Sequence, residues 1–361
     1  MPRIAVDAMG ADASPRVEVE GVVAAVRERG ISVVLVGDEP RLRAELQRLG
    51  AGKDSKDGKD KIDVLHAPEV ITMHDAPSMA VKQKKKSSMR MCFDLVKSGE
   101  ADAVISAGNS GAMMACGLFV LGRLPGVERP AIVTTFPTKA GECALLDMGA
   151  NVDPKPGVLA QFGVLGAVYA RLLHGKERPK VGLLSNGSEE HKGTALTRDA
   201  HALLSRASQR GPADAAFSFV GYVEGRDIFK GEVDVVVTDG FTGNVVLKSV
   251  EGAAEAIMSM VREEVMRSGI IAKVGAALMT SALRRLKKRT DYAEHGGAPL
   301  LGVEGVALIC HGGSSAAALK NAVYVADRFA QIGLGQELTA AIARHAFLWD
   351  NAAPKSVGAL S

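Results

Sequence analysis

The sequence predicts an α/β protein with a mostly parallel sheet and helices on both of its faces. Strand-like apolar runs alternate with helical patterns along most of the 361 residues, which is typical of parallel βα units. Hydrophobic residues make up 47% of the chain and aromatic residues only 4%, so Val, Ala, Leu and Ile must build the core, as in buried parallel strands. Many of the 40 glycines follow the apolar runs, where turns at strand ends need them.

The elements are predicted in chain order from apolar runs and from helix starts and stops. The first strand is expected at 3–7, and Ser14 followed by Pro15 is typical of a helix start, with Gly30 at its end. A second strand at 32–36 precedes a basic helix at 41–49. The remaining strands are predicted at 62–66, 103–106, 131–135, 144–147, 180–184, 217–220 and 233–238.

No proline-rich linker divides the chain, so we expect residues 1–361 to form one compact catalytic unit. Segment 51–61 is almost wholly charged or glycine and is predicted to be an exposed, mobile loop. The stretch 252–289 has a helical apolar pattern that Gly269 and Gly275 weaken in the middle. The tail, 351–361, is expected to be flexible.

Composition excludes several classes of function. The four cysteines are scattered without a Cys-x-x-Cys pair, which favours free thiols in a reducing cytosol. No secretory signal opens the chain, and the net charge of +3 does not imply a nucleic-acid partner. No zinc-type cluster, dinucleotide-type Gly-x-Gly-x-x-Gly or Gly-x-Ser-x-Gly elbow occurs, so neither a metal nor a cofactor is expected.

Three short turns rich in Gly and Asn are the main candidates for chemistry. They are SAGNSGA at 106–112, LLSNGSEEHKGT at 183–194 and TDGFTGNVV at 238–246, and each follows a strand-like run. Such turns place backbone N–H groups and a helix start at a sheet edge, which suits a phosphate-like anion. Because ligands of α/β sheets bind at the carboxyl ends of strands, we expect the three turns to converge on one crevice.

Each turn also has a plainer interpretation. Segment 109–111 could cradle an oxyanion or make a tight turn that needs small residues. Lys192 could bind an anion or be an ordinary solvated lysine. Asp239 could orient a lysine, ligate a metal or cap the helix that follows it.

Two basic runs are candidates for partner binding. KQKKK at 82–86 is either a solvated face or a site for an acidic partner. LRRLKKR at 283–289 follows the apolar segment 270–283, and this juxtaposition indicates core or dimer packing or a membrane-surface helix.

Eight motifs of the sequence are DAMGAD (7–12), ISAGNSGA (105–112), RPAI (129–132), LLDMGANVDPKP (145–156), VGLLSNGSEEHKGT (181–194), VEGRDI (223–228), VVVTDGFTGNVVLK (235–248) and EHGGAPLLG (294–302). They appear in the order of a known family, and the sequence resembles the bacterial PlsX phosphate acyltransferases from about residue 3 to residue 329.

The resemblance implies a fold similar to the isocitrate and isopropylmalate dehydrogenases and to phosphate acetyltransferase, a homodimer, and no cofactor. It also implies that orthophosphate attacks a long-chain acyl thioester of acyl carrier protein, which gives acyl phosphate for phospholipid synthesis. It further implies a cytoplasmic enzyme that associates peripherally with the inner face of the membrane.

Residue roles follow from the motifs and the resemblance together. The predicted catalytic residues are Lys192 and Asn244, which would stabilise phosphate and the developing oxyanion. The predicted phosphate-binding residues are Asn109, Ser110, Gly111, Gly193 and Gly243, with Asp7, Arg226 and Asp239 in support. The predicted carrier-protein docking residues are Lys82, Lys84, Lys85, Lys86, Arg284 and Arg285. Thr194 stands where asparagine is common in the family, which puts a ligand role there in doubt.

Three other functions are alternatives. A phosphotransacetylase that uses short acyl-CoA would share the turns. A metal- and NAD-dependent dehydrogenase of the same fold would need metal carboxylates and a nucleotide loop. A non-catalytic, membrane-associated scaffold of lipid synthesis would not need the intact turns.

Overall fold

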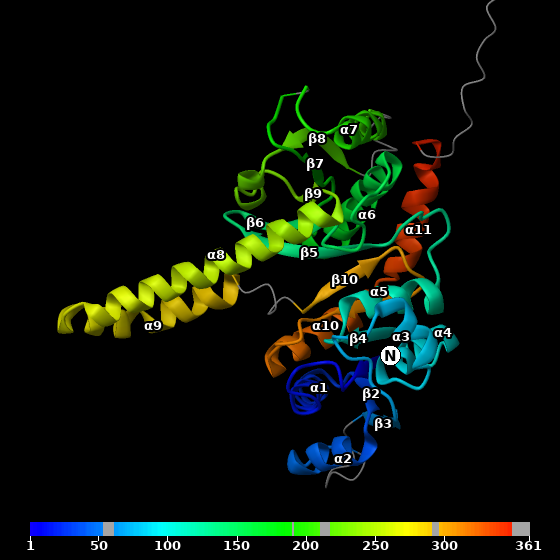
Figure 1. Ribbon diagram of the computed structural model, residues 1–361, viewed down its shortest axis with the longest axis vertical. Coiled ribbons are helices and arrows are strands. Elements are labelled where there is room, and N and C mark those ends of the chain that lie inside the picture. Colours follow the sequence, from blue (N-terminus) through cyan, green and yellow to red (C-terminus); the bar gives the residue numbers. More distant parts are fainter. Residues whose placement is uncertain (53–60, 190, 210–216, 291–295, 349–361) are drawn as a thin grey trace, which may run out of the picture.

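One eleven-stranded sheet runs through the protein (Figure 1). The computed structural model describes residues 1–52, 61–189, 191–209, 217–290 and 296–348, the side chains of 283–290 excepted. The strand order is β3-β2-β1-β4-β11-β10-β5-β6-β9-β7-β8. The strands are β1 (Arg3–Asp7), β2 (Ser32–Gly37), β3 (Ile62–His66), β4 (Ala103–Ser106), β5 (Ala131–Thr138), β6 (Gly141–Leu146), β7 (Lys180–Leu184), β8 (Ser218–Val223), β9 (Val235–Val237), β10 (Ala298–Leu301) and β11 (Val306–Ile309).

The sheet consists of two parallel segments joined through antiparallel strands. In the first half, β3, β2, β1, β4 and β11 are parallel, and in the second half β6, β9, β7 and β8 are parallel. Between them β10 is antiparallel to β11 and β5, and β5 is antiparallel to β6. Three antiparallel pairings lie between the two halves. The strands of the first parallel segment therefore run in the opposite direction to those of the second. The carboxyl ends of the two halves therefore lie at opposite edges of the sheet.

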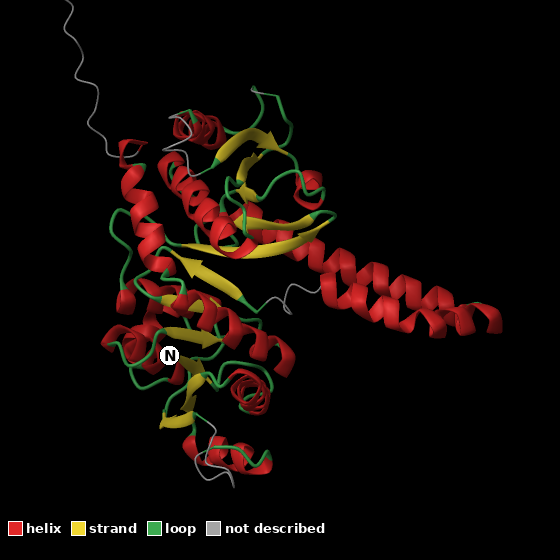
Figure 2. Cartoon of the chain, turned by 180° about the vertical axis from the view of Figure 1, so that it is seen from behind, coloured by secondary structure: helices red, strands yellow, loops and turns green. Residues whose placement is uncertain are grey.

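Helices cover both faces, as predicted (Figure 2). One face packs against α1 (Arg16–Arg29), α2 (Glu39–Arg48), α6 (Pro156–His174), α7 (Ala195–Ser208), α10 (Ala316–Gln331) and α11 (Leu334–Arg344). The other packs against α3 (Pro77–Gln83), α4 (Ser88–Ser98), α5 (Ser110–Cys116) and the short helices η1 (Gly117–Leu121) and η2 (Gly225–Phe229). Side chains alternate between the two cores along β1, where Ile4 and Val6 face one and Ala5 the other.

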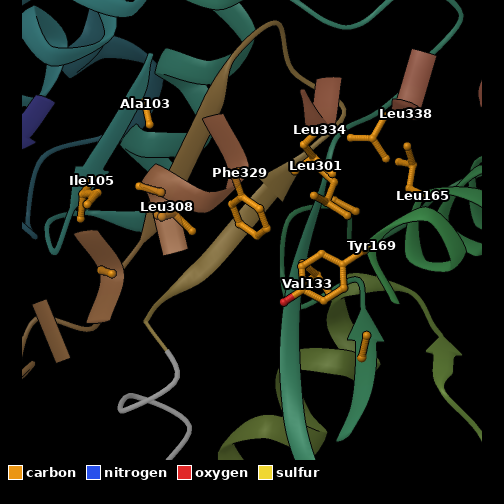
Figure 3. Close-up of a cluster of buried hydrophobic side chains, with 14 of the residues drawn as sticks. Ala103, Ile105, Val133, Leu165, Tyr169, Leu301, Leu308, Phe329, Leu334 and Leu338 are labelled. Carbon is orange, nitrogen blue, oxygen red and sulfur yellow. The ribbon is translucent and has the colours of Figure 1, made fainter. Parts of the chain in front are cut away.

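The core is aliphatic, and α6 lies in the middle of it. Figure 3 shows Leu165 and Tyr169 of α6 gathered with Phe329, Leu334 and Leu338 from the C-terminal helices. Among the described helices, α6 alone is long and apolar enough to cross a membrane, but 72% of that window is buried in the protein. Its hydrophobicity is therefore that of a core helix. All four cysteines are free and buried, as expected.

Several elements differ from the sequence prediction. Strands β10 and β11 were not predicted, and α1 begins at Arg16, after Ser14 and Pro15. The helical stretch 252–289 belongs to two helices, α8 (Gly240–Arg267) and α9 (Ile270–Thr290), which separate next to Gly269 and project from the body as a hairpin (Figures 1 and 2). Most of the charged segment 51–61 and the whole tail 351–361 lie outside the described residues.

Candidate functional site

The second and third predicted turns lie side by side at one edge of the second half. Strands β7 and β9 are parallel neighbours, with Leu183 opposite Val237, so the turns that follow them begin at adjacent strand ends. The loop 147–151, which follows β6, joins them because β6 is the other neighbour of β9. The edge thus combines three loops, which we call the second-half edge.

Lys192 lies within the turn that follows β7. Its aliphatic chain and the Glu189 carboxylate both lie over Gly187, where a Cβ atom would come within 3.1 Å of Lys192 Cγ and 2.7 Å of Glu189 Oε2. The lysine is half-buried, and its ammonium group has no hydrogen bond or ion pair to any described residue. Gly193 has φ +85° and donates its N–H to Asn186 Oδ1 at 3.1 Å. Gly193 therefore shapes the turn rather than offering its N–H to a ligand.

Thr194 caps the helix that leaves this turn. Its hydroxyl accepts a hydrogen bond from Thr197 N, and Thr197 reciprocates to the Thr194 N–H, which completes a capping box for α7. Asparagine and threonine are both good N-caps. The departure from the family pattern at this position therefore preserves a structural role.

Asn244 is exposed near the start of α8, and its side-chain amide has no hydrogen bond to a described residue. Asp239 is the helix cap, because its carboxylate accepts from Thr242 N at 2.8 Å and Thr242 Oγ1 at 2.7 Å. Of the three roles open for Asp239, the capping role is the one that these bonds support. The Gly243 N–H donates to Asp239 O at 2.9 Å, so Gly243 also has a structural use.

A buried carboxylate that the sequence analysis left without a role organises the loop after β6. Asp147 is completely buried and accepts from Ile132 N (3.0 Å), Ala150 N (3.2 Å), Asn151 N (2.6 Å) and Asn151 Nδ2 (2.9 Å). Burial raises the pKa of Asp147, while hydrogen bonds from Asn151, Ile132 and Ala150 oppose that shift. Its signal in the sequence was the motif LLDMGANVDP, which gave a resemblance but no mechanism.

The first predicted turn belongs to the other half of the sheet. It follows β4, whose carboxyl end lies at the edge opposite the other two turns, and in Figure 1 β10 and β5 separate α5 from β9. The expectation of one shared edge is thus wrong for this turn. The Asn109 amide is fully used in the protein: Oδ1 accepts from Ala112 N, and Nδ2 donates to Thr72 O and Asp75 O. Ser110 and Gly111 remain exposed.

Asp7 lies beneath that first-half turn. It is 2% exposed and accepts a hydrogen bond from Ser106 Oγ at 2.6 Å. Burial raises its pKa, against the effect of the Ser106 bond. Gly10 packs so closely on Gly108 that a Cβ would lie 2.6 Å from Gly108 N. These contacts make Asp7 a support of the turn that contains Asn109.

Of the other residues predicted for the site or for docking, two form ion pairs within the protein and three are exposed lysines. Arg226, in η2 next to the end of β8, is exposed and contacts Glu224 Oε1 at 3.0 Å. Lys84 donates to Asp75 at 2.6 Å and to Val70 O at 2.9 Å, so it ties a loop together. In contrast Lys82, Lys85 and Lys86 are exposed. The side chains of Arg284 and Arg285 lie outside the described part of the chain.

Nothing in the described residues gathers three or more metal-ligating side chains. The arrangement at the second-half edge instead offers one cation, one free amide and a helix start. That set is suited to stabilising an anion and a polarised carbonyl oxygen.

Comparisons with known proteins agree with this reading of the fold. A phosphotransacetylase from Streptococcus pyogenes superposes with a TM-score of 0.59 and 17% identity over 92% of this chain and 94% of its own. A 4-hydroxythreonine-4-phosphate dehydrogenase from Klebsiella pneumoniae gives a TM-score of 0.50 at 14% identity, over 91% of this chain and 98% of its own. The chain thus has the α/β fold shared by phosphotransacylases and these dehydrogenases.

Sequence comparison gives the family. The model of the family described as "Fatty acid synthesis protein" matches residues 2–336. A phosphate acyltransferase from Geobacter sulfurreducens is 54% identical over 336 residues, which cover 93% of each chain. This protein belongs to that fatty acid synthesis family.

Proposed function

We propose that this enzyme transfers a long-chain fatty acyl group from an acyl carrier protein thioester to orthophosphate, and so supplies acyl phosphate to phospholipid synthesis. Family membership supports an acyl transfer in lipid synthesis, and the relatives named phosphate acyltransferase support phosphate as the acceptor. The observation that carries the proposal is the pair Lys192 and Asn244, a half-buried cation and a free amide in turns that follow neighbouring strands.

The reaction is a direct displacement. An oxygen of orthophosphate attacks the thioester carbonyl carbon, the C–S bond breaks, and the leaving thiolate takes up a proton. Phosphate is anionic near neutral pH, and a thiol with a pKa of about 8.5 leaves without a strong acid. The reaction therefore needs positive potential and positioning more than a general base.

Lys192 and Asn244 supply these needs. The Lys192 ammonium group neutralises the phosphate and the charge that develops on the carbonyl oxygen, and the Asn244 amide donates to the same charge. Gly193 and Gly243 serve phosphate binding indirectly, by shaping the two turns. Arg226, near the end of the neighbouring strand β8, adds positive potential.

The first-half turn lies at the opposite edge of the sheet, and its Asn109 amide is already bonded within the protein. Phosphate in this proposal therefore binds at the second-half edge, without Ser110 and Gly111. Ser110→Ala should leave the KM for phosphate unchanged, and a raised KM would show that the first-half turn binds phosphate after all.

The acidic carrier protein docks on a surface formed by Lys82, Lys85, Lys86, Met79 and Phe119. The two apolar side chains are 51% and 59% exposed, and Lys82 Nζ lies 5.6 Å from the centre of the Phe119 ring. Such a surface combines a charge for steering with an apolar contact. Lys84 does not contribute to this docking surface, because its ammonium group is paired with Asp75. The reversal of Lys85 and Lys86 to Glu should raise the KM for carrier substrate and reduce its salt dependence.

The α8–α9 hairpin forms the contact with a second copy of the chain or with the membrane. Its apolar side chains are unusually exposed, with Ile270 at 81%, Ile271 at 91% and Leu278 at 80%. An isolated hairpin that exposes this much apolar surface is covered in a functional state. We place the enzyme in the cytoplasm as a homodimer that touches the inner face of the membrane through 270–289. Flotation with anionic liposomes and sedimentation of a hairpin-deleted variant separate the two contacts.

Purified protein tests the proposal. Palmitoyl carrier protein, palmitoyl-CoA and acetyl-CoA are each supplied with phosphate, and acyl phosphate is measured. We expect the carrier substrate to react fastest, and Lys192→Ala to lower the turnover by on the order of 10²–10³. Lys180→Ala is the matched control, because Lys180 is exposed at the opposite end of the same strand. Near-normal turnover of Lys192→Ala refutes the assignment, and preference for acetyl-CoA indicates a phosphotransacetylase.

A further inference from the structure

The loop 147–151 lies directly under the first turn of α8, which carries Asn244. We infer that Asp147 is a positioning residue for the reaction, acting on Asn244 through this loop. The inference rests on the proposed function, because it takes Asn244 to be part of the site. Neither the motif comparison nor the relatives assign a role to Asp147.

The loop is held in one conformation by the Asp147 carboxylate. Both carboxylate oxygens accept two N–H groups each, from Ile132 and Ala150 on one side and from the Asn151 backbone and side chain on the other. The Asn151 amide also donates to Pro130 O at 2.8 Å. Four accepted N–H bonds favour the acceptor-only carboxylate over the protonated acid, whose O–H would face one of these donors. Asp147 therefore closes the loop by accepting hydrogen bonds.

The closed loop contacts three residues of the α8 turn. The Gly240 N–H donates to Asn151 O at 2.7 Å. A Cβ on Gly243 would lie 1.9 Å from Asp147 O, so the helix backbone rests against that carbonyl. A Cβ on Gly149 would lie 3.7 Å from Cβ and Cγ of Asn244, which places the Asn244 side chain over Gly149.

Little else holds the beginning of α8. In a helix of 28 residues, Gly240 and Gly243 are the buried ones, and both lie on this loop. Only a few residues of the next turns, such as Val246 and Val250, pack partly on the core. The direction in which Asn244 points is thus set mainly by the loop that Asp147 closes.

The consequence is a coupling between Asp147 and Asn244. In Asp147→Asn, the new amide group would face N–H donors on one side, so the loop opens and the α8 turn shifts. A displacement of about 1 Å at a reacting group can lower turnover by about 10²-fold. If Asp147 acts through Asn244, the loss in Asp147→Asn and the loss in Asn244→Ala will not multiply in the double variant.

A double-mutant cycle on the full-length enzyme tests the inference. We expect Asp147→Asn to lower kcat by about 10²-fold, and the double variant with Asn244→Ala to be little slower than the worse single variant. Leu42→Ala, a buried change in α2 of the other half, is the control for lost stability, and its effect should multiply with that of Asn244→Ala. Asn151→Ala, which removes two bonds of the same loop, should behave as Asp147→Asn does.

The outcomes are distinct. Losses in Asp147→Asn and Asn244→Ala that multiply overturn the positioning role. Failure of both loop variants to fold also overturns it, because it would make the loop a stability element. A wild-type enzyme that forms no acyl phosphate instead refutes the proposed function itself.

Discussion

Gly243→Ala is the sharpest steric test of how α8 is seated. The new Cβ would be 1.9 Å from the Asp147 carbonyl oxygen, about 1.5 Å closer than ordinary contact at 3.4 Å, and that oxygen belongs to the backbone. The first turn of α8 must therefore move away by a comparable distance, which breaks the 2.7 Å bond from Gly240 N to Asn151 O. Overpacking of this kind costs roughly 1–3 kcal/mol of unfolding free energy. The displaced Asn244 should lower kcat by about 10²-fold.

Gly252→Ala in the same helix is the matched control. A Cβ at Gly252 meets nothing within 4 Å, and alanine is favoured over glycine in a helix interior by about 1 kcal/mol. We expect this variant to have an unchanged or higher Tm and normal turnover. Thermal unfolding and acyl phosphate formation are measured on both variants. If Gly243→Ala matches Gly252→Ala in both assays, the tight seating of α8 on the loop is wrong.

Three further predictions concern other parts of the chain. The Lys84 hydrogen bond lowers the pKa of Asp75 to about 2, so Lys84→Met should return that pKa toward 3.8 in an NMR titration. Because the pKa of Asp75 is lower in the folded protein, the stability that the Lys84–Asp75 pair contributes is present above pH 3.8 and is lost as the pH falls through about 2. If acid unfolding of Lys84→Met matches that of the wild type, the pairing is contradicted. Thr194→Asn should leave the free energy of unfolding unchanged, whereas Thr194→Ala should lower it by about 1 kcal/mol. Equal losses in the two variants would exclude a capping role for Thr194. Phe162 is fully buried in α6, so Phe162→Ala should lower the free energy of unfolding in urea by about 3–5 kcal/mol. A loss below about 1 kcal/mol would show that the core collapses around the cavity.

The sequence predicted the parallel strands well because each is a short apolar run between turns. The bounds 3–7, 62–66, 103–106 and 180–184 agree with β1, β3, β4 and β7. Strands β10 and β11 were not predicted: β10 lies inside the motif EHGGAPLLG, which served only for the family resemblance, and the short apolar run of β11 was assigned to no element. The true hairpin between β5 and β6 has only residues 139–140 between its strands, whereas the predicted strands stood eight residues apart. That gap concealed the antiparallel pairing.

The missed antiparallel strands also explain the error at the candidate site. Turns at the carboxyl ends of strands share an edge only if all the strands point the same way. Strands that are buried on both faces have continuous apolar runs whichever way they point, so the sequence could not reveal the three reversals between β11 and β6. The turns of Lys192 and Asn244 do share an edge, because no reversal lies between β7 and β9. The turn of Asn109 lies beyond all three.

The glycines of these motifs are better explained by contact than by phosphate. The motif TDGFTGN was interpreted as a source of backbone donors, yet the N–H groups of Gly240 and Gly243 are both bonded within the protein. In both Gly240 and Gly243, the Cα packs against the backbone of the loop 147–151, so any side chain there would collide with it. Glycine at these positions lets two loops from neighbouring strands touch. A motif of this kind can identify a family through a contact that tolerates no other residue. In the proposed function, the ligand is then met by the residues between and beside the glycines, of which Asn244 is the exposed polar one.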